Sequence, residues 1–211
     1  MRQIRCRARA AGAYHALVRC FLAVDLPAPV RNHLAKTARS VQSSCEVKWV
    51  AADKLHLTLL FAGALPDQNV EALCELVREL DVPPLRLSLS GLGHFPPRGL
   101  PRVIWAGVDG DVAALAAIHH TIDERARPLG VEREKRGFTP HITLGRVTGQ
   151  FGALALVDAI GRLGQALNKK PFAPTELVLY RSELRPGGAI HEALVRRPIP
   201  PGPAANTATL D

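Results

Sequence analysis

A four-residue pattern occurs twice in this 211-residue chain. Its copies are His56-Leu57-Thr58-Leu59 and His141-Ile142-Thr143-Leu144. Chance predicts about 0.05 occurrences of His-x-Thr-Leu in a chain of this composition, so two copies indicate a shared role. In a β-strand, alternate side chains point to opposite faces, so each copy would bury its two apolar residues and present His and Thr together on the other face. The chain is therefore expected to fold around two matched strands.

Hydrophobic periodicity predicts strands and helices that are interleaved along the chain. The order contains hairpin-like strand pairs rather than regular βαβ units, which indicates an α+β fold with a mainly antiparallel sheet. The expected helices are 30–41, 70–80, 111–129 and 153–167. The expected strands are 20–26, 47–50, 56–61, 85–89, 103–108, 141–147, 177–184 and 189–195.

Length and composition predict one folded domain, or two small lobes that share one fold, over residues 20–197. Residues 1–19 contain five arginines and no acidic residue, and we expect them to form a disordered leader. Residues 198–211 are rich in proline, and we expect a disordered tail. No apolar run reaches the roughly 18–20 residues of a membrane helix, and the leader lacks a clean apolar signal region, so we expect a cytoplasmic protein.

The charge is compatible with an RNA partner but does not require one. The formal net charge is +8, and the leader contributes +5 of it, so the expected domain is only mildly basic. The four cysteines are too widely spaced for a C-x-x-C redox or zinc motif and are interpreted as reduced thiols.

Two other interpretations of the repeated pattern are weaker. A single His on a strand is usually a surface or hydrogen-bonded core residue, but this does not account for two matched copies. Zinc needs three or four ligands, threonine is not one of them, and neither copy is part of an H-x-x-x-H pattern, so we expect no metal.

The residue types point to cleavage of a phosphodiester. This reaction needs a general base for the attacking oxygen and a general acid for the leaving oxygen, on opposite sides of the phosphorus. Imidazole suits both tasks because its pKa lies near neutrality. Threonine hydroxyls can donate hydrogen bonds to the non-bridging phosphate oxygens. Two facing His-x-Thr strands would thus supply a metal-free acid–base site.

The chain resembles the 2H phosphoesterases, and within them the RNA 2′,3′-cyclic phosphodiesterases, also called 2′-5′ RNA ligase-like proteins. The resemblance spans about residues 20–197. It rests on both motifs, on the segments that flank them and on the order of those segments. The segments are 21–27, 49–50, 55–59, 61–63, 91–96, 101–108, 138–146 and 177–184.

The resemblance implies two pseudo-symmetric lobes, each a mainly antiparallel sheet with helices on the outside, and an active site in the cleft between them. It assigns His56 as the proton donor to the departing 3′ oxygen and His141 as the proton acceptor that activates water. Thr58 and Thr143 would hold the phosphate oxygens. The implied substrate is RNA with a 2′,3′-cyclic phosphate end, or a small cyclic nucleotide, converted to a 2′-phosphomonoester without a metal. Apart from the resemblance, we expect a monomer that needs no cofactor.

Arg146, Arg181 and His191 are further candidates for substrate binding, as is Arg136. A surface charge is the favoured interpretation of each of the three arginines, and a contact with RNA phosphates is the alternative. His191 stands where the family pattern has tyrosine, and a solvated strand residue is the favoured interpretation there, with a cleft-lining role as the alternative. By strand parity Phe61 would share the apolar face of Leu57, so we expect it in the core rather than stacked on a base.

Gly91-Leu92-Gly93 is too short for a phosphate-binding loop and is interpreted as a turn. The non-catalytic alternative is an RNA-end-binding domain, although binding alone would tolerate the loss of one histidine.

Overall fold

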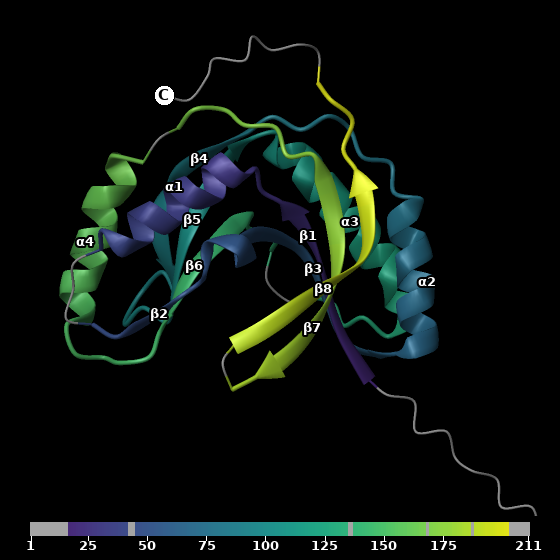
Figure 1. The fold of residues 1–211 in the computed structure, drawn as a ribbon, viewed down its shortest axis with the longest axis horizontal. Coiled ribbons are helices and arrows are strands. Elements are labelled where there is room, and N and C mark those ends of the chain that lie inside the picture. Colours follow the sequence, from purple (N-terminus) through teal and green to yellow (C-terminus); the bar gives the residue numbers. More distant parts are fainter. Residues whose placement is uncertain (1–16, 42–44, 135–136, 168, 187, 203–211) are drawn as a thin grey trace, which may run out of the picture.

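The computed structural model describes residues 17–41, 45–134, 137–167, 169–186 and 188–202. Strands and helices alternate along the chain (Figure 1). The strands are β1 (Leu17–Asp25), β2 (Val47–Trp49), β3 (His56–Pro66), β4 (Leu87–Phe95), β5 (Val103–Gly110), β6 (His141–Val147), β7 (Glu176–Arg185) and β8 (Gly188–Pro198). The helices are α1 (Ala28–Arg39), α2 (Asp67–Arg78), α3 (Val112–Ala126) and α4 (Ala153–Gln165), with short 3₁₀ helices η1 (Ala52–Lys54) and η2 (Arg127–Leu129).

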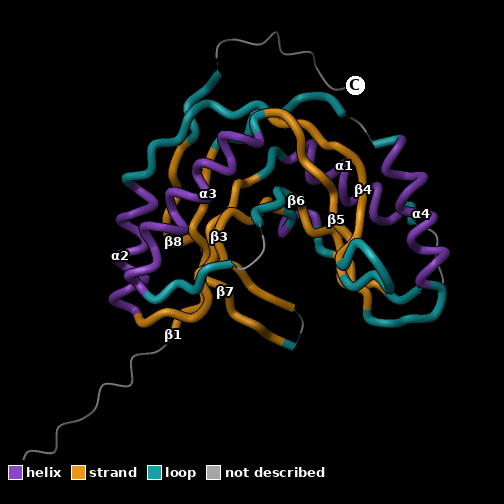
Figure 2. The backbone as a smooth tube through the Cα atoms, turned by 180° about the vertical axis from the view of Figure 1, so that it is seen from behind, coloured by secondary structure: helices purple, strands orange, loops and turns teal. Residues whose placement is uncertain are grey.

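The strands form one curled sheet in the order β4-β5-β6-β3-β1-β7-β8, and β2 pairs with β6. Every strand pair is antiparallel. The sheet has two lobes: β1, β3, β7 and β8 are covered by α2 and α3, and β2, β4, β5 and β6 are accompanied by α1 and α4 (Figures 1 and 2). The predicted α+β fold, with antiparallel sheet inside and helices outside, is confirmed.

The two lobes join where β3 pairs with β6. The register there places Leu57 across from Ile142, which are the equivalent positions of the two His-x-Thr motifs. Because the strands are antiparallel, a local two-fold axis passes between these two residues. Both side chains are fully buried. The repeated motif therefore lies at the centre of the pseudo-symmetry.

The core is built from aliphatic side chains on the helix-covered side of the sheet and on the helix faces that pack against it. α3 buries Leu115, Ile118 and Ile122, which recur at helical spacing. α2 buries Leu73 and Val77 in the same way. No helix of the described chain is long and apolar enough to cross a membrane.

Both expected domain boundaries need correction. β1 begins at Leu17, and Val18 is only 6% exposed, so the last three residues of the expected leader belong to the sheet. Ile199 is buried and its N–H donates to the carbonyl oxygen of Thr175 at 2.8 Å, so the folded chain also continues past 198. The rest of the expected leader, 1–16, and residues 203–211 of the expected tail lie outside the described residues.

The expected turn at 91–93 is wrong, because these residues continue β4. The register between β4 and β5 shifts between Leu89 and Leu92, and Gly91 takes up the irregularity with a φ of +120°, which favours glycine. Gly93 lies against the indole of Trp105, where an added Cβ would sit 2.4 Å from Cζ2. The glycines thus allow a bulge and a close approach inside a strand.

Candidate active site

The pairing of Leu57 with Ile142 brings both predicted motifs together. Since these two side chains are buried on one face of the sheet, their neighbours in each strand point to the opposite face. All four of these neighbours are half-buried. They are His56, Thr58, His141 and Thr143. The structure therefore places two imidazoles and two hydroxyls on one open face around the local two-fold axis.

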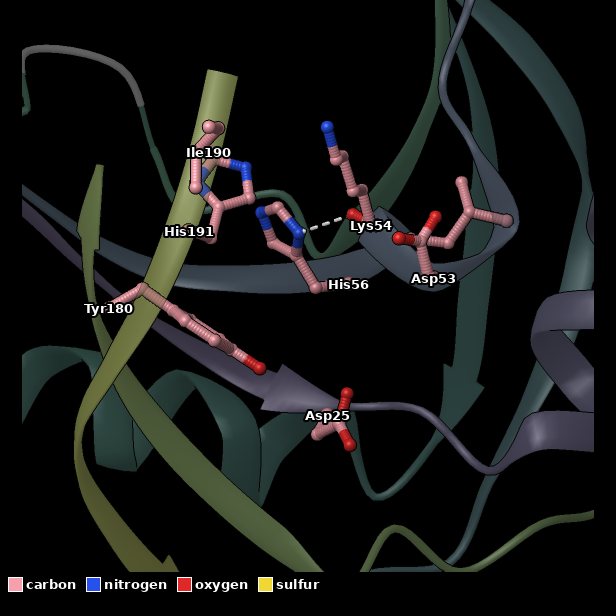
Figure 3. A pocket seen from close by; sticks show the side chains of 8 residues that line it. Asp25, Asp53, Lys54, His56, Tyr180, Ile190 and His191 are labelled. Atoms are coloured by element: carbon pink, nitrogen blue, oxygen red, sulfur yellow. Dashed lines mark hydrogen bonds between the residues drawn. The ribbon is translucent and has the colours of Figure 1, made fainter. Parts of the chain in front are cut away.

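Both imidazoles are held in the same way by the backbone. Nδ1 of His56 lies 2.8 Å from the carbonyl oxygen of Lys54, and Nδ1 of His141 lies 2.7 Å from that of Thr139 (Figure 3 for His56). A carbonyl oxygen only accepts, so Nδ1 must be the donor in each ring. Nε2 of each ring is then left to accept or donate a proton. In both motifs the anchoring carbonyl belongs to the residue two positions before the histidine.

An aromatic side chain also supports each histidine. Phe21 stacks on His56 with ring centroids 4.8 Å apart, and Phe95 meets His141 edge-on at 5.0 Å. Trp105 adds a second contact to His141 at 6.3 Å. Packed rings restrict the rotamers of the imidazoles, which preorganises the two groups for proton transfer.

A pocket of about 250 Å³ opens beside His56. Side chains from β1, η1, β3, β7 and β8 line it (Figure 3). They are Asp25, Asp53, Lys54, Leu55, His56, Tyr180, Ile190 and His191. The lining combines an aromatic ring with groups of both charges, so the pocket can receive a small polar ligand next to Nε2 of the histidine.

Burial lowers the pKa of His56 below its ordinary value of 6.5. The carbonyl of Lys54 and the carboxylate of Asp25 oppose this shift, whereas His191 adds to it. Burial also lowers the pKa of His191, with a contribution from the Lys54 ammonium. The pocket of the unliganded protein thus favours neutral imidazoles.

The other predicted residues are placed differently. Arg146 lies across from Val103, which by strand alternation shares the face of Trp105, so it is on the same open face as His141 but toward the other end of β6. Arg181 lies across from the buried Cys20, on the opposite face from Tyr180, and the structure does not bring it into the site. Arg136 lies outside the described residues.

Two side chains correct the interpretations made from strand parity and pattern. His191 is half-buried and lines the pocket, so it is not a solvated strand residue. Phe61 is 60% exposed rather than part of the core, because the register between β1 and β3 shifts between Leu22 and Ala23. The irregularity reverses the parity of β3 after Thr58. Phe61 therefore points to the same face as Phe21, which is the residue of β1 that it pairs with.

Sequence reasoning missed the supporting groups of the site. Lys54 and Thr139 contribute through backbone carbonyls, which no side-chain pattern reveals. Phe21 and Phe95 belong to segments that carry the family resemblance, but nothing in the sequence pairs them with particular histidines. In the described part of the chain, no three His, Cys, Asp or Glu side chains gather into a group that could hold a metal ion.

Most of the chain is similar to known proteins. Residues 24–105 and 108–191 match the family model described as LigT like Phosphoesterase, and each stretch contains one His-x-Thr motif. The RNA 2′,3′-cyclic phosphodiesterase of Methanothermobacter thermautotrophicus is 33% identical over 177 residues, which cover 82% of this chain and 95% of the relative. The protein of the same name from Methanocaldococcus jannaschii is 30% identical, over 84% of this chain and 98% of the relative.

Solved structures agree with these sequence matches. The crystal structure of E. coli LigT complexed with 3′-AMP is 28% identical in sequence and superposes with a TM-score of 0.69. The alignment covers 87% of this chain and 98% of that one.

Proposed function

The chain belongs to the LigT-like phosphoesterase family, and from this premise we propose that it hydrolyses the 2′,3′-cyclic phosphodiester end of RNA to a 2′-phosphomonoester. The proposed mechanism is metal-independent acid–base catalysis by two histidines. The relatives described above are RNA 2′,3′-cyclic phosphodiesterases, which supports this choice of substrate.

One observation carries the proposal: Leu57 pairs with Ile142, so the two His-x-Thr motifs lie side by side and antiparallel. A phosphorus placed on the local two-fold axis would have one imidazole on each side of it. Cleavage of a phosphodiester by in-line displacement requires an acid and a base in this arrangement.

In the proposed reaction, Nε2 of His141 takes a proton from water, and the resulting hydroxide attacks the phosphorus. Nε2 of His56 donates its proton to the departing 3′ oxygen, so the phosphate stays on the 2′ oxygen. The hydroxyls of Thr58 and Thr143 donate hydrogen bonds to the two non-bridging oxygens as negative charge develops on them. The water supplies one proton to His141 and its oxygen to the phosphate, so the atoms balance.

Binding of the substrate supports the acid role of His56. Its pKa is lowered in the open pocket, mainly by burial. A phosphodiester anion beside the ring favours the charged form, so the substrate itself promotes protonation of the acid. The exposed Arg146, on the same face as His141 but toward the other end of β6, is a candidate contact for an RNA phosphate.

The substrate is RNA with a cyclic end or a small cyclic nucleotide, because both present the same reacting group. The same acid and base also serve the reverse 2′-5′ ligation in principle. We further propose that the protein acts in the cytoplasm as a monomer.

The test is incubation of an oligoribonucleotide that ends in a 2′,3′-cyclic phosphate, in the presence of EDTA, followed by identification of the product phosphate. A 2′-phosphomonoester formed at the rate seen without EDTA supports the proposal. A 3′-phosphomonoester contradicts the assigned acid, and activity that is lost with EDTA and restored by a divalent ion contradicts the metal-free mechanism. Binding of the cyclic end without turnover would favour the RNA-end-binding alternative.

A further inference from the structure

The ring of His191 on β8 lies directly against the ring of His56, the proposed general acid. The two ring centroids are 5.9 Å apart and the ring planes cross at 88°, so His191 is edge-on to His56. It is also edge-on to Phe21, with centroids 4.9 Å apart, and Phe21 in turn stacks on His56. Figure 3 shows the two imidazoles next to one another at one end of the pocket. These three rings therefore form one packed group.

The two histidines differ in how their protons are held. Nδ1 of His56 is bound to the carbonyl oxygen of Lys54 at 2.8 Å. Nδ1 of His191 is buried, and within the described residues it has no hydrogen-bond partner. No backbone acceptor thus fixes the proton of His191 to one nitrogen, and a buried polar atom without a partner is itself unfavourable. The His191 imidazole is free to change its protonation state without breaking a hydrogen bond at Nδ1.

The charged groups that line the pocket around the pair come from two elements, η1 and β1. η1 contributes Asp53 and Lys54. Nζ of Lys54 donates to the carbonyl oxygen of Ala189 at 2.8 Å, and Ala189 lies two residues before His191 in the chain. β1 contributes Asp25, which is engaged by the guanidinium of Arg31 at 3.0 Å.

The remaining titratable group is the Tyr180 hydroxyl on β7, whose pKa is raised, mainly by burial. It is neutral near pH 7. The Lys54 ammonium disfavours a proton on His191, and a proton on His191 disfavours one on His56.

We propose that His56 and His191 share one proton as a coupled pair, and that His191 is a positioning residue which controls when His56 can act as the acid. As the pH falls, the neutral pair in the empty pocket takes up one proton, and the first proton opposes uptake of the second. An entering phosphate anion offsets this repulsion, so His56 becomes protonated when the substrate is bound. The pair therefore titrates in two coupled steps rather than as two independent groups.

The effect on the pH dependence of hydrolysis rests on the proposed function. The effect on the pKa of His56, which NMR can measure without substrate, does not. Removal of the charge at position 191 should raise the pKa of His56. For two unit charges 5.9 Å apart, Coulomb's law gives a shift of about half a pH unit at the dielectric constant of water. The shift is larger in a partly buried pocket, where the effective dielectric constant is lower.

The kinetic test compares His191→Gln and His191→Tyr with the wild type in hydrolysis of the cyclic-ended oligonucleotide. His191→Tyr keeps an aromatic ring against Phe21 and so controls for lost packing. His120→Gln, on the exposed face of α3, is the matched control for the chemical change. We expect the alkaline limb of kcat/KM to move to higher pH by about half a unit or more in both variants at position 191, and to stay in place in the control. A fall in kcat with no movement of the limb would assign His191 a purely structural role and overturn the proposal.

The second test is an NMR titration of the histidine ring protons in the substrate-free protein. The midpoint for His56 should rise in His191→Gln, and the wild-type curves of the two residues should each deviate from a single-site titration. An unchanged midpoint would refute the pair. Absence of turnover in the wild type would refute the proposed function alone, because the NMR titration judges the pair without any substrate.

Discussion

Gly93 gives a sharp test of the close packing behind His141. An added Cβ at this position would lie 2.4 Å from Cζ2 and 2.5 Å from Cη2 of Trp105, well inside van der Waals contact. The indole is a rigid ring that also contacts His141, with centroids 6.3 Å apart. Gly93→Ala therefore cannot be accommodated without movement of Trp105 or of β4.

Overpacking of this kind lowers the free energy of unfolding by about 1–3 kcal/mol. The matched control is Gly161→Ala on the exposed face of α4, where an added Cβ meets nothing within 4 Å. Alanine is favoured over glycine in a helix by roughly 0.5–1 kcal/mol, so the control should become more stable. Urea unfolding of the two variants measures both changes. We also expect kcat/KM to fall in Gly93→Ala, since His141 loses its support, and to stay unchanged in Gly161→Ala. Equal stability of the two variants would refute the assigned close contact.

The other predictions concern the catalytic groups. Thr58→Val and Thr143→Val should each lower kcat about 10²–10³-fold, because each removes one hydrogen bond to a charged phosphate oxygen, and single-turnover rates check this. Thr148→Val, which alters an exposed hydroxyl that donates to the carbonyl oxygen of Glu46, should leave the rate unchanged. Equal rates in all three variants would argue against the phosphate contacts. The alkaline limb of kcat/KM should lie below pH 6.5, because burial lowers the pKa of His56 and the protonated acid is lost as pH rises through that value; a limb well above 6.5 would contradict the assignment.

The sequence predicted the parts of the fold that depend on regular alternation. The His-x-Thr strands bury Leu57 and Ile142 because apolar and polar residues alternate there, and the same rule located most other strands. The helices α2 and α3 followed from apolar residues at helical spacing. The four side chains of the two motifs were therefore predictable as candidates from the sequence.

Two of the failures share one physical cause, since parity cannot be followed through a bulge. The irregularity in β3 turns Phe61 outwards, and the one in β4 lets Gly91 and Gly93 continue a strand where a turn was expected. The position of His191 was equally hidden, because it depends on how the β7–β8 hairpin lies across β1 rather than on local pattern. Long-range pairing, and not local propensity, decided these side chains.

The most direct test of the two-histidine account is the rate of hydrolysis of a 2′,3′-cyclic-ended oligoribonucleotide by His56→Ala and His141→Ala. Each variant should lose about 10²–10⁴-fold in kcat, the usual effect of removing a general acid or base. His120→Ala, which alters an exposed histidine on α3, should retain the wild-type rate. The double variant should be little slower than either single one, because the two groups act as a unit. Near-wild-type turnover by a folded His56→Ala or His141→Ala variant would contradict the account.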